Sequence, residues 1–111
     1  MKKFIRVMKA LSDPNRVRVI KLLQEKDLCV CEVQKVLGLA QSTVSKHMKL
    51  LEDAGLVEKV RQGTWVIFSL ADGSDSEYVA TMLDNLSQWL DEDIELQAMK
   101  KELPMAALLR K

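Results

Sequence analysis

Two short helical patterns separated by a glycine constrain the fold of this chain more than any other feature. Val30 to Leu37 has the length and apolar spacing of a short helix, and Gly38 suits a left-handed C-terminal cap. After a short turn, a second helix is expected from Ser42, its cap, to Gly55. Its inner stripe holds Val44, Met48 and Leu51. Residues 30–55 therefore predict a helix-turn-helix.

The period of the pattern changes after Gly55. Residues 56–61 and 65–70 are short runs rich in β-branched and aromatic side chains, joined across Gln62-Gly63. They predict a tight antiparallel hairpin over residues 56–70. A hairpin directly after a helix-turn-helix indicates a winged helix-turn-helix, a mainly α fold with a small β-hairpin.

Helical patterns flank this unit on both sides. Ser12-Asp13-Pro14 supplies a cap and a proline suited to a first helical position, which predicts a helix from Pro14 to Glu25. A long final helix is predicted over residues 76–103, capped by Asp75 or Ser76. A first helix is expected from apolar residues that recur at helical spacing, namely Phe4, Ile5, Met8 and Leu11.

Length and charge narrow the class of protein. The 111 residues, 48% of them apolar, suffice for one core, so a single domain over residues 1–111 is expected. No apolar run reaches the length of a membrane span and no signal-peptide pattern is present, which predicts a cytoplasmic location. Residues 1–70 carry a net charge of +6 and residues 71–111 of −5. This asymmetry is typical of nucleic-acid binding, although two ordinarily solvated halves would also produce it.

The exposed side of the second helix and the hairpin offer groups that suit DNA. Amides and short hydroxyls read base edges in the major groove, and lysines neutralise phosphates. Basic residues of the hairpin suit the neighbouring backbone or minor groove. Any one of these residues could simply belong to a polar surface. Taken together with the turn and the wing, the whole set favours binding of double-stranded DNA. The candidate DNA-binding residues are Gln41, Ser42, Thr43, Ser45, Lys46, His47, Lys49, Lys59, Arg61 and Gln62.

Cys29 and Cys31 are the only cysteines in the chain. A disulfide across one intervening residue would be a strained small ring, so reduced thiols are expected. Two soft thiols beside a DNA-binding unit indicate a thiophilic metal or metalloid site that controls DNA binding. Packing of Cys31 in the core and redox sensing by the thiols are the alternatives.

The spacing of the two cysteines predicts a mechanism. Residues two apart on an ideal helix point about 200° away from each other. If the helix runs through Cys29 and Cys31, both sulfurs reach one ion only when the helix start unwinds or shifts. Such a distortion would change the spacing, in a dimer, of the two helices that follow the turn and face DNA. The ligand would thereby shift the population away from the DNA-binding arrangement.

Four segments resemble the ArsR/SmtB family of winged-helix metal-sensing repressors, and the resemblance covers nearly the whole chain. The segments are Leu11-Ser12-Asp13-Pro14-Asn15-Arg16-Val17-Arg18, Leu28-Cys29-Val30-Cys31-Glu32-Val33, Gln41-Ser42-Thr43-Val44-Ser45-Lys46-His47-Met48-Lys49-Leu50-Leu51 and Gly55-Leu56-Val57. The resemblance implies a homodimer that binds an inverted-repeat operator and releases it when an inducer binds. Cys29-Val30-Cys31 is similar to the arsenite- and antimonite-responsive branch, in which these thiolates are ligands.

One position departs from that branch. Gln34 stands where a third cysteine often lies, and an amide oxygen is a poor ligand for a thiophilic ion. Water, hydroxide, an added thiol or a partner-chain group would then complete the site. The His and acidic cluster of the family's zinc-sensing variant is absent from the final helix. His47, the only histidine, is predicted to face DNA or to cap a helix rather than to bind metal.

The final helix has a wider apolar stripe than a small monomer needs, and the resemblance implies dimerisation through the first and last helices. A face for another partner and simple core packing are the alternatives. The candidate dimerisation residues are Phe4, Met8, Met82, Leu86, Trp89 and Leu90.

No enzyme is expected, because the sequence holds no nucleophile-base set, no Gly-rich phosphate loop and no paired carboxylates beyond Asp91-Glu92-Asp93. A winged-helix thiol-metal carrier or interaction module that does not bind DNA remains as another class. DNA affinity that falls steeply with salt would distinguish a repressor from such a module.

Overall fold

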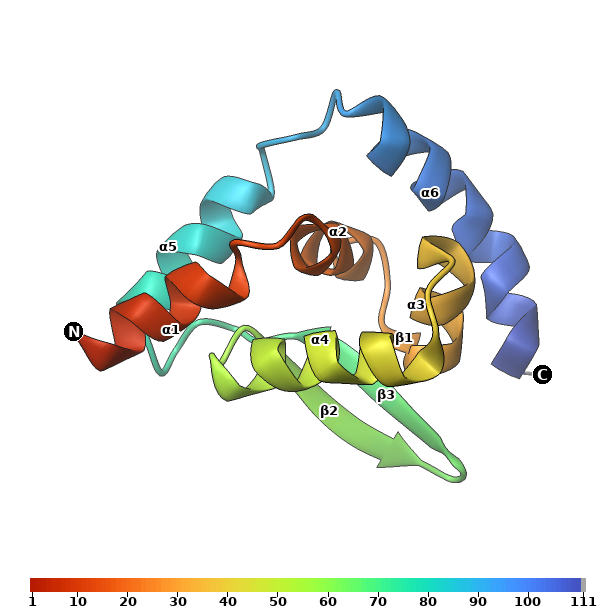
Figure 1. Ribbon diagram of the computed structural model, residues 1–111, viewed down its shortest axis with the longest axis horizontal. Coiled ribbons are helices and arrows are strands. Elements are labelled where there is room, and N and C mark those ends of the chain that lie inside the picture. Colours follow the sequence, from red (N-terminus) through yellow and green to blue (C-terminus); the bar gives the residue numbers. More distant parts are fainter. Residues whose placement is uncertain (111) are drawn as a thin grey trace.

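The computed structural model describes residues 1–110 and combines six helices with a small sheet in that part of the chain (Figure 1). The elements are α1 (Lys2–Ala10), α2 (Pro14–Leu23), β1 (Leu28–Cys29), α3 (Val30–Leu37), α4 (Gln41–Asp53), β2 (Val57–Gln62), β3 (Trp65–Leu70), α5 (Glu77–Leu86), α6 (Ile94–Ala106) and a 3-10 turn (Ala107–Arg110). The predicted mainly α fold with a winged helix-turn-helix is confirmed. Within the described chain, every helix is too short or too polar to cross a membrane.

The helix-turn-helix begins as predicted but its second helix has a different cap. α3 has the predicted bounds, and Gly38 closes it in the left-handed region at φ +68°, donating its N–H to the Gln34 carbonyl at 2.9 Å. α4 starts at Gln41 with Ala40 as the N-cap residue, so the predicted Ser42 cap is wrong. Ala40 already has the extended backbone of a cap residue, and Ser42 therefore falls inside the first turn.

α2 is capped as predicted. The Asp13 carboxylate accepts hydrogen bonds from the backbone N–H groups of Asn15 at 2.8 Å and Arg16 at 3.3 Å. Partial burial raises the pKa of Asp13, but these hydrogen bonds and the nearby positive charge lower it below its usual range. α2 ends at Leu23 rather than Glu25, because the Glu25 N–H turns back onto the Leu22 carbonyl at 3.0 Å.

The strands form an antiparallel sheet in the order β1-β3-β2. The β2–β3 hairpin was predicted, whereas β1 was not. In β1, Leu28 pairs with Phe68 and Cys29 pairs with Ile67. This short strand therefore attaches the chain just before α3 to the wing.

The core lies between the helix-turn-helix, α2 and the sheet. The predicted inner stripe of α4 is confirmed, since Val44, Met48 and Leu51 are buried. They belong to the same cluster as Ile20 of α2 and Phe68 of β3. α6 packs against α3 and α2 and adds buried apolar side chains near its C-terminal end (Figure 1).

The single helix predicted over residues 76–103 is wrong: it is two helices, α5 and α6, separated by residues 87–93. Ser76 caps α5 as predicted, its hydroxyl accepting from the Val79 N–H at 3.4 Å. The break occurs at Leu90, whose φ of +66° is incompatible with a continuing right-handed helix. Asp93 then caps α6 by accepting from the Leu96 N–H at 3.0 Å.

A buried lysine fixes this break to α2. Lys21 is 0% exposed, and its Nζ donates to the Leu86 carbonyl at the end of α5 and to Asp91 Oδ1, both at 2.7 Å. The hydrogen bond from Lys21 lowers the pKa of Asp91. Because an acid with a lowered pKa stabilises the fold when ionised, this contribution is present at neutral pH and is lost as pH falls through that pKa.

Lys21→Met keeps an unbranched stem of similar size but removes both hydrogen bonds. We expect the free energy of unfolding to fall by about 1–3 kcal/mol, since the Leu86 carbonyl loses its buried partner. Urea unfolding followed by circular dichroism measures this change. Asp91→Asn, which keeps an acceptor oxygen at an exposed position, is the matched control with a smaller expected loss. A Lys21→Met variant as stable as the wild type would contradict the structural role of Lys21.

Candidate nucleic-acid interface and thiol site

The outer face of α4 presents most of the residues predicted to contact DNA. Gln41, Ser42, Thr43, Ser45 and Lys46 are all exposed in the first half of the helix. The inner stripe fixes this orientation, because buried Val44 and Met48 hold the opposite side of α4 in the core. The arrangement leaves amide, hydroxyl and ammonium groups free for base edges and phosphates.

His47 is less available than its neighbours on α4. It is half-buried, and its Nδ1 lies 3.1 Å from Arg16 Nη1. A guanidinium only donates hydrogen bonds, so His47 Nδ1 is the acceptor in this contact. Arg16 also donates to the carbonyls of Ala10 at 2.7 Å and Lys9 at 3.2 Å. His47 is thus held in a contact that joins α1, α2 and α4.

Two of the predicted basic contacts are already paired with carboxylates. Lys49 lies 3.1 Å from Asp53 one turn later, and this hydrogen bond raises the pKa of Lys49. Lys59 of β2 lies 3.5 Å from Glu52 of α4. Lys46, by contrast, has no acidic partner among residues 1–110.

The wing carries the remaining candidates. Arg61 and Gln62 are exposed at the distal end of β2, in a hairpin that extends away from the helices (Figure 1). The Lys59–Glu52 ion pair connects β2 of this hairpin to α4. The structure thus places Lys59 beside α4, and Arg61 and Gln62 farther out on the same hairpin.

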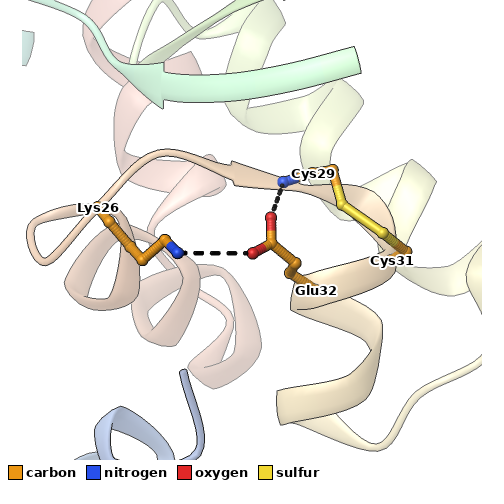
Figure 2. Close-up of a disulfide and its surroundings, with 4 residues drawn as sticks. All are labelled: Lys26, Cys29, Cys31 and Glu32. Atoms are coloured by element: carbon orange, nitrogen blue, oxygen red, sulfur yellow. Dashed lines mark hydrogen bonds and ion pairs between the residues drawn. A yellow bond between two sulfur atoms is a disulfide. The ribbon is translucent and has the colours of Figure 1, made fainter. Parts of the chain in front are cut away.

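The two cysteines lie in different elements. Cys29 ends β1 and is the residue before α3, whereas Cys31 lies in the first turn of α3. Their sulfurs are joined in a disulfide, with 5.4 Å between the Cα atoms (Figure 2). The expectation of reduced thiols is therefore not met in this structure.

The prediction that the two sulfurs point away from each other unless the helix start unwinds is also wrong. It assumed that the helix runs through both cysteines, but Cys29 has an extended backbone at φ −86° and ψ 166°. The two side chains meet while α3 keeps its full predicted length. Bringing both sulfurs to one ligand therefore requires no unwinding of α3, and the thiol pair instead spans the junction of β1 and α3.

Glu32 supports this junction from the other side. It is fully buried, and its Oε1 accepts the Cys29 N–H at 2.9 Å, while Oε2 lies 3.7 Å from Lys26 Nζ (Figure 2). An acidic residue at this position of a helix start forms one half of a capping box. The carboxylate of Glu32 thereby fixes the backbone of Cys29.

The site offers soft ligands from sulfur alone. Within residues 1–110 no three His, Cys, Asp or Glu side chains gather as a metal-binding group. Gln34 lies one turn after Cys31 and is half-buried. When reduced, the pair suits a thiophilic ion or metalloid through two sulfur bonds.

The candidate dimerisation residues are divided between surface and core. Leu86 is 5% exposed and belongs to the core, so its predicted availability to a partner is not met. Phe4 is exposed and makes an edge-to-face contact with Tyr78 of α5. Met8 and Met82 are half-buried, and Trp89 and Leu90 are exposed in the break after α5.

Sequence reasoning missed three residues that shape these sites: Arg16, Lys26 and Glu32. Cys29 and Glu32 have the spacing of a capping box, with cysteine in place of serine or threonine, and this pattern would have revealed the role of Glu32. Arg16 and Lys26 carry no comparable local signal, because their partners are set by the tertiary fold.

Comparison with known proteins agrees with this geometry. Residues 13–59 match the family model for bacterial regulatory proteins of the arsR family. The chain is 34% identical over 105 residues to the arsenic resistance transcriptional regulator ArsR1 of Pseudomonas putida, covering 90% of this chain and 81% of that protein. It is 36% identical over 73 residues to the arsenical resistance operon repressor of Bacillus subtilis, covering 65% and 70%.

A solved structure gives the same result for the fold. The homodimeric winged helix-turn-helix DNA-binding domain of a possible ArsR-family regulator from Mycobacterium bovis is 29% identical, with a TM-score of 0.68. The match covers 85% of this chain and 83% of that one. Together with the arrangement of α3, α4 and the β2–β3 wing, these similarities show that this chain belongs to the ArsR family of bacterial transcriptional regulators.

Proposed function

We propose that this protein is a homodimeric repressor that binds an inverted-repeat operator and releases it when arsenite or antimonite bonds to Cys29 and Cys31. The observation that carries the proposal is the meeting of the two sulfurs at the junction of β1 and α3. Names of relatives with arsenic resistance functions support the choice of ligand.

The DNA-binding part of the proposal rests on α4 and the wing. Exposed amide and hydroxyl groups in the first half of α4 suit base edges in the major groove, with Lys46 beside them for a phosphate. Arg61 and Gln62 at the end of the hairpin suit the adjacent backbone or minor groove. Dimerisation through α1 and α5 would present two such units to an inverted repeat.

The thiol site is placed where it can affect both DNA-binding parts. Cys29 pairs with Ile67 of the wing strand β3, and Cys31 belongs to the helix that precedes α4. A ligand bonded to both sulfurs therefore spans the wing and the helix-turn-helix. Release requires that this ligand bind the DNA-free arrangement more tightly than the DNA-bound one.

The disulfide favours a second candidate, in which oxidation of the same pair releases DNA. In that reaction the two thiols lose two electrons and two protons to an oxidant such as peroxide, which is reduced to water. The ligand and the oxidant would act at the same junction.

The first experiment titrates arsenite into an operator complex of the reduced protein and follows release by fluorescence anisotropy. We expect wild type to dissociate, and Cys29→Ser and Cys31→Ser to remain bound, because one thiolate cannot form the two-sulfur site. Both variants should bind free operator with wild-type affinity, which controls for folding. Antimonite, cadmium, zinc and peroxide are tested in parallel.

Each outcome of this titration decides between the candidates. Release of all three proteins at one arsenite concentration would contradict the thiol site. Release by peroxide, with no response to arsenite or antimonite, would favour redox sensing instead.

A second experiment addresses the DNA contacts. Lys46→Ala should weaken operator binding and reduce the slope of log K against log salt by about one per protomer, because a phosphate contact is lost. Lys49→Ala on the same helix is the matched control. Its effect should be smaller, since Lys49 must give up Asp53 to reach a phosphate. Equal slopes for wild type and Lys46→Ala would contradict this placement.

A further inference from the structure

We propose that one face of α1, formed by Lys2, Arg6 and Lys9 and called the basic face here, binds the phosphate backbone of the operator between its two half-sites. This rests on the proposed function, in which a dimer binds an inverted repeat. It adds a third DNA-binding part to α4 and the wing.

The positive charge of the first 70 residues is concentrated on α1. Of their net charge of +6, residues 1–10 supply +4, with four basic residues and no acidic one. Residues 41–53 of α4 carry two basic and two acidic residues, and residues 57–62 of β2 have a net charge of only +1. The two DNA-binding parts already described therefore account for little of the charge that indicates nucleic-acid binding.

The basic face is exposed and carries no bound acid. Its three residues are spaced by four and three positions, which places them on one side of the helix, and all three are exposed. They line a groove between α1 and α4, together with Ile5 and Leu50. No ion pair among residues 1–110 involves α1. Asp53 also lines the groove, but it is paired with Lys49 at 3.1 Å.

The groove adjoins the side of α4 that is proposed to contact DNA. Leu50, which lines the groove from α4, is one turn after Lys46 and lies on the same side of the helix. Glu52, which pairs with Lys59 of the wing, points about 200° away from Leu50 on α4. α1 and the wing therefore flank α4 on opposite sides, with the DNA-facing residues between them.

Arg16 holds α1 in this position. Its Nε donates to the Ala10 carbonyl at the end of α1 at 2.7 Å, and its Nη1 lies 3.1 Å from His47 Nδ1 on α4. One guanidinium thus bridges both helices at the groove that it also lines. The helix that carries the basic face is therefore preorganised relative to α4 before DNA binds.

The proposed dimer would place the basic face over the centre of the operator. α1 is one of the helices proposed for dimerisation, and the twofold axis of a dimer passes through the centre of an inverted repeat. Phe4, which contacts Tyr78 of α5, points about 200° away from Arg6, so dimer contacts through Phe4 leave the basic face open. Lys2 and Lys9 are about 10 Å apart along the helix, and a DNA strand carries a phosphate about every 3.4 Å along its axis. The three side chains can therefore reach separate phosphates.

The test measures the affinity of the full chain for an operator duplex over a range of salt concentrations. We expect Arg6→Gln to reduce the slope of log K against log salt by about two per dimer, because each protomer loses one phosphate contact. Lys3→Gln is the matched control. It removes the same charge from the same helix at a position outside the groove lining, and its slope should stay close to that of wild type. Sedimentation shows whether each variant remains a dimer.

A modified operator locates the contact along the DNA. Methylphosphonate linkages remove the charge of chosen phosphates, either between the half-sites or at the outer ends of the duplex. We expect the central substitution to weaken binding of wild type on the order of tenfold. It should weaken Arg6→Gln less, because part of the contact is already lost. Substitution at the outer ends should weaken both proteins equally.

The outcomes separate this inference from the proposed function. A lower salt slope for Lys46→Ala with an unchanged slope for Arg6→Gln would overturn the contact by α1 and leave the repressor proposal standing. Equal losses for Arg6→Gln and Lys3→Gln would also overturn it, because they would indicate general attraction rather than a contact by one face. A monomeric Arg6→Gln protein would assign the basic face to the dimer interface instead. Wild-type protein that does not bind the operator duplex would overturn both proposals.

Discussion

The pairing of β1 with β3 is the contact on which the proposed switch depends. It consists of only two residue pairs, Leu28 with Phe68 and Cys29 with Ile67. These two pairs connect the start of the helix-turn-helix to the wing. Without this pairing Cys29 would belong to a free loop, and a ligand there would act only on α3. With it, the two sulfurs join the elements that are expected to contact DNA.

The contacts around this junction determine which parts are firmly held. Glu32 fixes the Cys29 backbone, and α6 packs against α3 from outside. Lys21 secures the break after α5 to α2, which fixes α5, one of the helices proposed for dimerisation, to the core. The Lys59–Glu52 ion pair between the wing and α4 is partly exposed, and exposed ion pairs contribute little stability. The wing is therefore held to α4 mainly by buried side chains such as Val57 and Phe68 rather than by this ion pair.

Much of the fold could be predicted from sequence because strong local signals mark it. Gly38 ends α3, Asp13 caps α2, and the hairpin follows from its β-branched runs. β1 was missed because two residues are too short to show a period. The final helix was predicted as continuous because the apolar spacing continues through Leu90, whose left-handed backbone carries no sequence signal of its own.

The candidate sites likewise contain features that the local sequence predicts and features that only the tertiary fold determines. The exposed face of α4 follows directly from its buried stripe, so the exposure of most residues predicted to face DNA could be predicted without a structure. The pairing of Lys49, Lys59 and His47 depends on side-chain positions, and Arg16 contacts His47 from 31 residues away. The opposed directions of the two cysteines required a helix that runs through both, and this condition is not met because Cys29 has an extended backbone before α3.

Hydrogen–deuterium exchange of the reduced protein, with and without bound arsenite, tests the coupling at this junction most directly. We expect ligand binding to change amide protection in β3 and at the α3–α4 turn as well as around the cysteines, at a ligand concentration that releases operator DNA. Operator release with unchanged exchange in β3 and α4 would contradict the claim that the thiol pair acts through the β1–β3 contact.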